Sequence, residues 1–399
     1  MTPLLAARQA WPAGMAFQLL ALVMACWPQT LATACPFCGT VGQSLSQRRD
    51  EASVVAVAEA EGGASADATG FLSQRFRLDQ LLRSNADAAI VGASVTARVV
   101  GPVAGTAVLF GTAAAGGAAA DPRRTWSAVA ADETLLGYVA TAPAISQPAA
   151  ERLRWFATRL EHPDPAIAAD AFTEFGLARY DDVCTAAAAL DPARLRAWVQ
   201  EPGIDARRRG LYGLLLGVVA AASEDAAVTR DCLDALHRAV EAPADDFRAG
   251  FDGVLAGVLV GEGVMGLEYL RERGLFGHDA RPLDQRHLLA ALRFAGESLT
   301  GTIPRKRIIA ATAALLVSPA VAADATVDLA RYQAWDEVAD VVRLWDSLGA
   351  NDPLVRRAVA GYLTACPLPA ANHELERIGR HNPGELKQAL DAAASPAAR

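Results

Sequence analysis

The period of the hydrophobic pattern changes once along the chain, near residue 148, and this change constrains the fold more than any other feature. Between residues 53 and 141 apolar and polar residues alternate, as in SVTARVV at 94–100, which is typical of a half-buried strand. From about residue 148 the apolar residues recur at helical spacing, as in VADVVRLWDSL at 338–348. The sequence therefore predicts a β-domain followed by a separate, all-helical domain.

The β-half contains several short strand patterns. The predicted strands are SVVAVAEA, GFLSQRFRLDQLL, SVTARVV, GTAVLFGT, TWSAVA and LLGYVAT. Gly–Gly, Gly–Pro and Asp–Pro pairs lie between them and favour turns. Five or six short strands without intervening helices favour a small closed or nearly closed barrel, and a compact β-sandwich is the alternative.

Helix starts in the second half share one form, in which Asp or Asn precedes Pro. The pairs are Asp164-Pro165, Asp191-Pro192, Asp352-Pro353 and Asn382-Pro383. The Asp or Asn side chain caps free amides, and Pro is tolerated at the first helical position. The most apolar runs stay below the roughly 18 residues of a membrane helix, which favours buried helices. Roughly a dozen helices with short connections predict a stacked α-solenoid.

The N-terminus has the pattern of a secretory signal peptide. Arg8 is followed by the apolar run MAFQLLALVMACW, and the small residues Ala32 and Ala34 precede Cys35. This pattern predicts a signal peptide at 1–34 that is cleaved before Cys35, and therefore export to the periplasm, the cell envelope or the medium. The apolar run would rise only about 20 Å as a helix, which is short for a bilayer.

Two alternatives remain for this segment. In the first alternative the segment is an N-terminal core helix. In the second it is the leader of a lipoprotein that is acylated at Cys35 or Cys26. With the signal peptide at 1–34, the predicted domains are a β-barrel at 35–147 and a helical domain at 148–399.

The charge balance argues against nucleic-acid binding. The chain has 37 Lys and Arg against 45 Asp and Glu, a formal charge of -8. Cleavage of the leader removes Arg8, so the mature chain has 36 minus 45, or -9. Broad nucleic-acid binding requires clustered cations that displace counterions from phosphate. We therefore expect a protein partner, no nucleic acid, and no transmembrane span in the mature chain.

The Cys-Pro-Phe-Cys motif at Cys35 and Cys38 has three interpretations. A redox dithiol of the thioredoxin type requires a preceding strand, and here the motif begins the predicted mature chain. A structural disulfide between the two cysteines, or a thiol that fastens the N-terminus to the barrel, is favoured. Both are also weak candidate metal ligands, because no second pair completes a four-ligand site. Buried thiols are predicted at Cys184, Cys232 and Cys366.

A glycine pattern typical of dinucleotide binding occurs in GEGVMG at 261–266. Its surroundings read as helix, whereas the dinucleotide motif requires a parallel sheet. Gly253, Gly257 and Gly261 are also spaced by four residues, which favours close packing between helices. We predict no cofactor here.

Two segments contain residue types that bind metals. HELER at 373–377 has Arg377 where the zinc-protease motif has its second histidine. HDARPLDQRH at 278–287 contains two His and two Asp, for which a solvated loop is favoured over a metal site. No catalytic residue is predicted.

Two resemblances bear on the fold. EHPDPAIAADAFTEFG and GANDPLVRRAVAGYL resemble HEAT repeats, in which Asp-Pro opens a helix. The mature chain resembles a group of uncharacterised exported bacterial proteins with an N-terminal CPFC, a small β-domain and a HEAT-like array. CPFC, RRRGLYGLLLG and DLARYQAWDEVADVVRLW carry this second resemblance, which implies no activity.

The β-half also resembles netrin-like OB modules, such as those of tissue inhibitors of metalloproteinases. FRLDQLLRS and GASVTARV correspond to two of their strands, while the cysteine spacing differs and the partner cysteines are missing. The expectation is an OB-like barrel joined to a HEAT-like α-solenoid. The expected function is protein or ligand binding in the cell envelope, without catalysis. The alternatives are a thiol-redox or metal-dependent enzyme that uses Cys35 and Cys38, and a netrin-like protease inhibitor.

Overall fold

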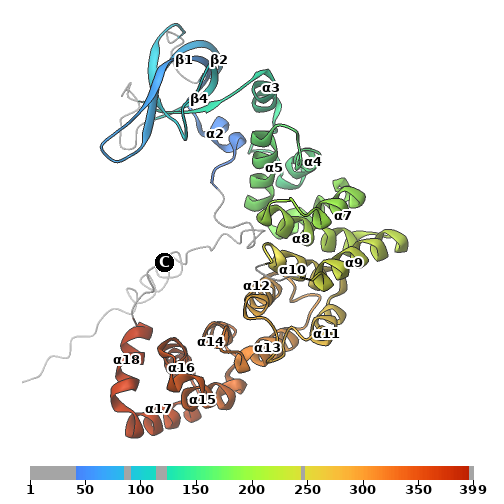
Figure 1. The fold of residues 1–399 in the computed structure, drawn as a ribbon, viewed down its shortest axis with the longest axis vertical. Coiled ribbons are helices and arrows are strands. Elements are labelled where there is room, and N and C mark those ends of the chain that lie inside the picture. Colours follow the sequence, from blue (N-terminus) through green and yellow to red (C-terminus); the bar gives the residue numbers. More distant parts are fainter. Residues whose placement is uncertain (1–41, 85–90, 114–123, 244–247, 395–399) are drawn as a thin grey trace, which may run out of the picture.

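The protein consists of a small β-barrel joined to a long array of helices (Figure 1). This arrangement confirms the predicted order of a β-domain and a helical region. The computed structural model describes residues 42–84, 91–113, 124–243 and 248–394. The predicted leader and the motif at Cys35 and Cys38 lie outside the described residues.

The strands close into a barrel, so the sandwich alternative is wrong. Within the described residues they are β1 (Val54–Ala66), β2 (Leu72–Ser84), β3 (Ser94–Arg98), β4 (Thr106–Ala113) and β5 (Arg124–Ala130). Their order around the barrel is β1-β2-β3-β5-β4, and β4 pairs back onto β1. The β3–β5 pair is parallel, and the other pairs are antiparallel. Closure leaves no long strand edge unpaired between β4 and β1.

Alternate residues of the strands fill the barrel interior. Phe76 and Leu78 of β2, Ala97 of β3 and Leu109 of β4 are fully buried. The residues between them point outward, as Arg98 does next to Ala97. The two-residue period of the sequence therefore separates the barrel core from its surface.

The prediction of a strand for LLGYVAT is wrong, because these residues lie in helix α3 (Glu133–Thr141). The Asp132 carboxylate accepts the Leu135 amide at 2.8 Å and caps the helix. Leu135, Tyr138 and Val139 lie on one helical face and are buried. Over so few residues, strand and helix patterns are hard to distinguish, and packing against other helices decides between them.

A short helix that the sequence pattern did not predict, α2 (Leu45–Glu51), precedes the barrel. Its capping box is complete: the Ser44 hydroxyl accepts the Gln47 amide, and the Gln47 side chain accepts the Ser44 amide, both at 3.1 Å. A helix of 7 residues is marginal in isolation, so α2 depends on its tertiary contacts.

The remaining helices follow α3 with short connections. The α-helices are α4 (Ala149–Ala157), α5 (Pro165–Leu177), α6 (Tyr180–Thr185), α7 (Pro192–Gln200), α8 (Ala206–Ala222), α9 (Ala226–Glu241), α10 (Phe251–Glu262), α11 (Val264–Glu272), α12 (Pro282–Ser298), α13 (Arg305–Ala313), α14 (Ala322–Arg331), α15 (Val338–Asp346), α16 (Pro353–Ala365), α17 (Pro369–His381) and α18 (Pro383–Ala394). Short 3-10 turns are η2 (Ala187–Ala189), η3 (Ala314–Val317), η4 (Trp335–Glu337) and η5 (Leu348–Ala350). Asp164, Asp191 and Asp352 cap α5, α7 and α16, as predicted from their Asp-Pro pairs.

The helices form a curved array in which alternate helices stack on one another (Figure 1). Helix α8 packs on α10, α10 on α12, α14 on α16, and α16 on α18. The backbones of α8 and α10 are in direct contact at their glycine residues. A Cβ atom added to Gly217 would lie 2.2 Å from the Gly257 carbonyl oxygen. One added to Gly253 would lie 2.1 Å from the Gly210 oxygen, so the predicted close packing at Gly253 and Gly257 is confirmed.

Helix α2 joins the barrel to the array through buried polar contacts. Asp170 of α5 is buried, and its carboxylate accepts the Leu45 amide at 2.6 Å and the Tyr138 hydroxyl at 2.7 Å. Beside it, Glu174 of α5 forms a buried ion pair with Arg152 of α4. Burial raises the pKa of both Asp170 and Glu174 above the usual carboxyl range.

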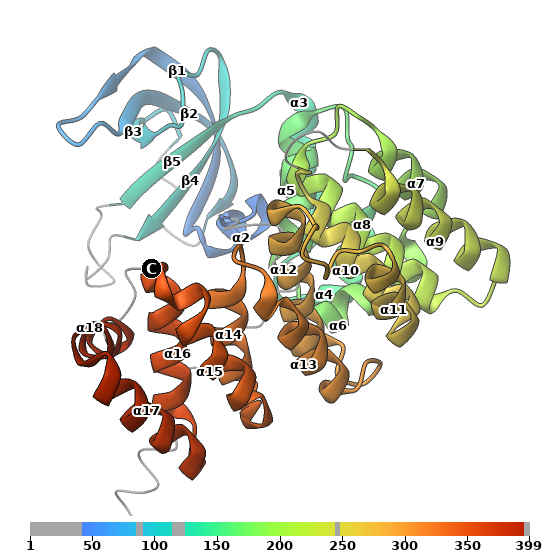
Figure 2. The same cartoon turned by 60° about the horizontal axis from the view of Figure 1, so that its bottom comes forward.

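On its other side, α2 is bound to the barrel and to the end of α3. Arg48 donates to the Ser127 hydroxyl of β5 at 2.9 Å, and its guanidinium lies 4.4 Å from the Phe110 ring centroid. Arg49 donates to three carbonyl groups at and just beyond the end of α3. Barrel residues and array residues consequently belong to one continuous apolar core. Figure 2 shows α2 lying between the barrel and the helices.

Candidate functional site

The structure places only some of the predicted site residues. Cys35 and Cys38 are outside the described residues, so the predicted disulfide and the weak metal alternative stay predictions. Cys232 and Cys366 are buried free thiols, as predicted, and Cys184 is half-buried.

The glycine pattern GEGVMG lies where α10 ends and α11 begins. Gly263, with a φ of 58°, separates the two helices. Helices lie on both sides of the motif, and it is helix α10, not a strand, that directly precedes it. The segment is therefore a junction between packed helices, as the alternative to dinucleotide binding predicted.

In the HELER segment, Arg377 is engaged in ion pairs. It lies 2.6 Å from Glu374 and 3.1 Å from Asp346. The side chain at the second zinc-ligand position therefore holds α17 to α15. Within residues 42–394, apart from the gaps given above, no three His, Cys, Asp or Glu side chains are grouped to hold a metal ion.

The predicted solvated loop HDARPLDQRH is only partly a loop. His278 and Asp279 are exposed, whereas Asp284 and His287 are buried in α12. The expectation is wrong for Asp284 and His287 because Pro282 starts helix α12, and both residues lie on its buried side. Asp284 faces Arg248 at 4.0 Å, and the His287 ring lies 3.7 Å from the carboxylate of Asp252.

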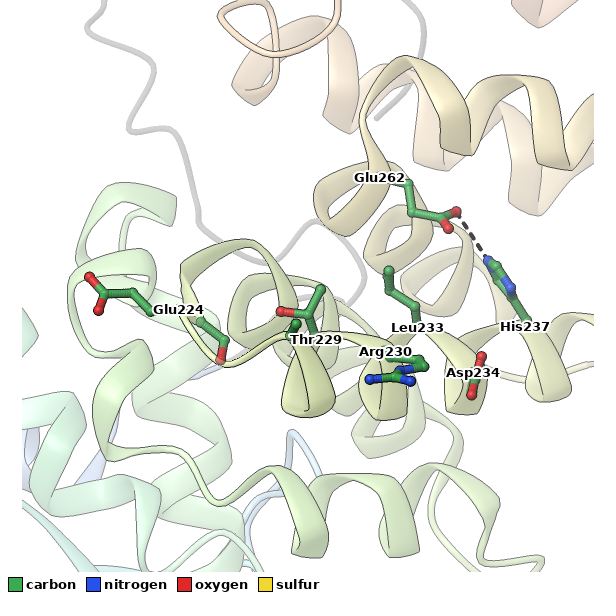
Figure 3. A pocket seen from close by; sticks show the side chains of 9 residues that line it. Glu224, Thr229, Arg230, Leu233, Asp234, His237 and Glu262 are labelled. Carbon is green, nitrogen blue, oxygen red and sulfur yellow. Dashed lines mark hydrogen bonds and ion pairs between the residues drawn. The ribbon is translucent and has the colours of Figure 1, made fainter.

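A hollow between α9 and α10 is lined by a pair of titratable side chains, His237 and Glu262 (Figure 3). His237 Nε2 lies 3.1 Å from Glu262 Oε2, and the His237 ring stacks on Tyr269 with 3.9 Å between centroids. The hydroxyls that line the hollow, Ser223 and Thr229, both donate to backbone carbonyl groups at 3.3 Å. Among the described residues neither hydroxyl forms a hydrogen bond with His237, so the His237–Glu262 pair connects α9 to α10 without the geometry of a nucleophile and its base.

The outer face of the β2–β3 pair contains a different kind of site. In the antiparallel register, Ser73 lies opposite Arg98, Arg75 opposite Thr96, and Arg77 opposite Ser94. Side chains opposite one another point to the same side of a sheet. This register therefore brings the exposed side chains of Arg75, Arg77 and Arg98 onto one surface, which faces away from the barrel core.

The same register, continued by two residues, places Phe71 next to Val100. The amide of Val99 donates to the Leu72 carbonyl at 3.0 Å, which extends the pairing beyond the end of β3. Phe71 is 57% exposed and Val100 is fully exposed. The Arg98 guanidinium lies 5.0 Å from the centroid of the Phe71 ring, within the range of a cation–π contact. We call Phe71, Arg75, Arg77, Arg98 and Val100 the barrel face.

The turn before Phe71 is held by a single carboxylate. Asp67 Oδ1 accepts the Thr69 amide at 2.8 Å, the Thr69 hydroxyl at 2.6 Å and the Phe71 amide at 3.0 Å. Hydrogen bonds from Thr69 lower the pKa of Asp67, so the carboxylate is charged under ordinary conditions. Gly70, with a φ of 83°, allows the chain to reverse here. The position of the Phe71 backbone is therefore defined by the turn.

The barrel face carries both charged signs side by side, because the register of β1 and β2 places Glu59 opposite Arg77 and Glu61 opposite Arg75. Arg77 forms an ion pair with Asp79 at 3.3 Å. On the neighbouring strand β1, Glu59 accepts the Thr106 hydroxyl and Glu61 accepts the Ser94 hydroxyl. Within the described residues, neither Arg75 nor Arg98 has a carboxylate within ion-pair distance. The exposed Phe71 and Val100 thus project from a surface on which arginines and carboxylates are mixed.

The phase of the arginines in the sequence is a signal for this site. Arg75 and Arg77 occupy the polar positions of the alternating segment SQRFRLDQ, and Arg98 occupies the same phase in SVTARVV. Alternation places the arginines of one strand on one face. It does not specify which strands are neighbours or in what register, and the grouping of Arg98 with Phe71 depends on both.

Comparison with other proteins gives no further guide to the site. No family model matches the chain, and the searches of curated proteins and of solved structures find no similar protein. Among the described helices, none combines the length and the apolar character that crossing a membrane requires.

Proposed function

We propose that the protein is an exported interaction protein of the cell envelope, without catalytic activity, which binds its partner through the barrel face. The observation that carries the proposal is the exposed Phe71, with Arg98 over its ring and Val100 beside it. Aromatic and arginine side chains dominate the binding energy of protein interfaces. In a chain of this size, such a pair left open to solvent is a candidate contact for a partner.

The support for the finer fold assignment is topological. The strand order with a parallel β3–β5 pair supports an OB-type barrel, a fold that binds ligands on its β2–β3 face. The stacking of alternate helices and the Asp-Pro helix starts support HEAT-like pairs. In this proposal the array supplies an additional extended surface and holds the barrel in place.

The proposal of export rests on the sequence of residues 1–34, which combines a charged start, an apolar run and small residues before Cys35. It places the barrel face outside the cytoplasm. A partner would then be a component of the envelope, either a protein or a surface.

Site-specific photo-crosslinking in living cells tests the proposal. A benzophenone amino acid is placed at Phe71 of the full chain and, as a matched control, at Leu354, which is 64% exposed on α16. We expect discrete adducts from position 71 and none of the same size from position 354. Combining the probe at 71 with Arg98→Glu should reduce those adducts, because the substitution reverses the charge beside the ring.

Two results would contradict the proposal. The first is an identical adduct pattern from positions 71 and 354, which would indicate random collisions. The second is the absence of adducts at position 71 in cells that express and export the protein at normal levels.

A further inference from the structure

We infer that the barrel face, together with the adjoining glutamates of β1, binds a second copy of this chain in a two-fold symmetric contact. The inference rests on the proposed function, since it names the partner of the same face. It follows from the register of the charged residues on β1 and β2, from the binding capacity that these residues leave unused, and from the position of Phe71 beside them.

The charged residues form two parallel rows of opposite sign. Strand β1 supplies Glu59 and Glu61, and β2 supplies Arg77 opposite the first and Arg75 opposite the second. The residues between them in each strand face the barrel core. Neighbouring strands are about 4.8 Å apart, so one strand spacing separates the two rows. A partner surface of a single sign would be repelled by one of the rows.

The opposite charges leave binding capacity unused. Glu61 accepts the Ser94 hydroxyl through Oε2 only, and Glu59 accepts the Thr106 hydroxyl through Oε1 only. Among the described residues, Arg75 forms no ion pair, although Glu61 lies opposite to it in the register. A guanidinium group binds a carboxylate through charge-assisted hydrogen bonds. Each copy therefore offers both a guanidinium and a carboxylate to a second molecule.

A two-fold axis that runs along the strands, midway between β1 and β2, makes this surface complementary to itself. Such an axis keeps the level of each residue along the strand and exchanges the two rows. Glu61 of each copy then faces Arg75 of the other, and Glu59 of each copy faces Arg77 of the other. An axis across the strands would place glutamates against glutamates, so the charges select one arrangement.

Phe71 supplies an apolar contact at one end of the same surface. It directly precedes β2 and is 57% exposed. In the two-fold arrangement the two Phe71 side chains lie at one level, roughly one strand spacing of 4.8 Å apart, which is within the range of an aromatic pair. The three hydrogen bonds that Asp67 accepts fix the backbone of the turn before contact. Less conformational freedom is therefore lost on binding than in a flexible loop.

The surface is open to a second copy. In Figure 2 the β1–β2 hairpin and β3 lie on the side of the barrel turned away from α3 and α5. With a formal charge of -8, two copies repel one another at long range, so association through an arbitrary part of the surface is disfavoured. A dimer therefore depends on the local contact, and the substitutions that abolish it are defined in advance.

Light scattering after size-exclusion chromatography measures the mass of the mature chain, residues 35–399, over a range of concentrations. We expect a mass that rises toward that of two chains as the concentration increases. Glu61→Arg alone and Arg75→Glu alone should each weaken dimer formation by about 100-fold or more, because like charges then face one another twice in the dimer. Each variant should remain a monomer at concentrations where the unaltered protein is a dimer.

Mixing these two single variants tests the pairing directly. In a mixed dimer, the copy with arginine at both positions faces the copy with glutamate at both positions, so mixing should restore dimers that neither variant forms alone. A chain that combines Glu61→Arg with Arg75→Glu should also dimerise with itself. Restoration excludes misfolding as the cause of the loss, because a variant that had lost its fold would not dimerise after mixing.

A separate substitution tests the apolar contact. Phe71→Ser should weaken dimer formation by about 30-fold or more, because one partly buried aromatic side chain is lost from each copy. The matched control is Leu354→Ser, which removes a similarly exposed apolar side chain on α16 and should leave the dimer unchanged.

The inference is overturned if the mass stays that of one chain at every concentration. It is also overturned if the single charge reversals leave the dimer intact, or if mixing them does not restore it. If the protein stays monomeric while position 71 crosslinks to a different envelope protein, the inference of a second copy falls and the proposed function stands. A monomer without adducts at position 71 removes both.

Discussion

The Tyr138 hydroxyl of α3 donates a 2.7 Å hydrogen bond to Asp170 Oδ2 of α5, at the point where the barrel meets the array. The other oxygen of the same carboxylate accepts the Leu45 amide at the start of α2. Burial, reinforced by the nearby Asp170 charge, raises the pKa of Tyr138 above its usual range, so the hydroxyl remains a donor. One buried carboxylate thus connects three helices.

Removing this donor should destabilise the protein. We expect Tyr138→Phe to lower the free energy of unfolding by about 1–3 kcal/mol, because the substitution leaves a buried carboxylate with one donor fewer. Urea denaturation measures the change. Tyr332→Phe is the matched control, since the Tyr332 hydroxyl makes no hydrogen bond within the described residues, and it should change stability by less than about 0.5 kcal/mol. Equal effects of the two substitutions would contradict a role for the Tyr138–Asp170 bond.

The raised pKa of Asp170 gives stability a defined pH dependence. Because the folded-state pKa lies above the unfolded value of about 4, the contribution of Asp170 is fully present below that pH. It is lost as the pH rises through the folded-state value. Asp170→Asn removes the titration, so the stability of the unaltered protein relative to this variant should fall as pH increases from about 4.

Asp67→Asn is the control, because the contribution of Asp67 to stability should change with pH in the opposite direction. The pKa of Asp67 is lowered, so its contribution is present above the unfolded pKa of about 4 and is lost as the pH falls through the folded-state value. Thermal unfolding of the three proteins across an acid-to-neutral pH series measures both differences. Parallel pH profiles for the two variants would contradict the assignment.

The glycine contact between α8 and α10 predicts a large effect from a single methyl group. Gly217→Ala should lower the free energy of unfolding by about 1–3 kcal/mol or more, because its Cβ would lie 2.2 Å from the Gly257 oxygen and the helices would have to separate. Gly137→Ala in α3 is the matched control, with no atom within 4 Å of the added Cβ. It should be neutral or stabilise the protein by about 0.5–1 kcal/mol, since Ala favours the helix over Gly. Chemical denaturation compares the two, and a similar loss in both would argue against backbone contact.

The predicted leader defines the N-terminus that we expect for the exported protein. N-terminal sequencing should begin at Cys35, and intact mass should show the loss of residues 1–34 without an added lipid. Under denaturing, non-reducing conditions an alkylating reagent should label Cys184, Cys232 and Cys366 but neither Cys35 nor Cys38, if the last two form a disulfide. Labelling of all the cysteines would contradict the disulfide, and an acylated N-terminus would establish the lipoprotein alternative.

The secondary structure of each half could be predicted from local sequence patterns. Alternation in SVTARVV specifies a strand because successive side chains point to opposite faces, and the structure has β3 there. Asp164 and Asp352 specify helix starts because an Asp side chain satisfies free amides within two or three residues of itself. The four-residue spacing of Gly253 and Gly257 indicates a helix contact, although it does not identify the partner helix. All of these effects operate within one turn or one strand.

Only the tertiary structure decided which distant residues meet. LLGYVAT is a helix because it packs in the array, and α2 is ordered because Leu45 meets Asp170, which lies 125 residues further along the chain. Phe71 and Val100 form one surface only through the register of β2 and β3. The sequence by itself determined the period of each segment and the position of its caps, since those depend on neighbouring residues. The barrel face and the α2 junction depend on contacts between residues far apart in the chain, which local patterns do not encode.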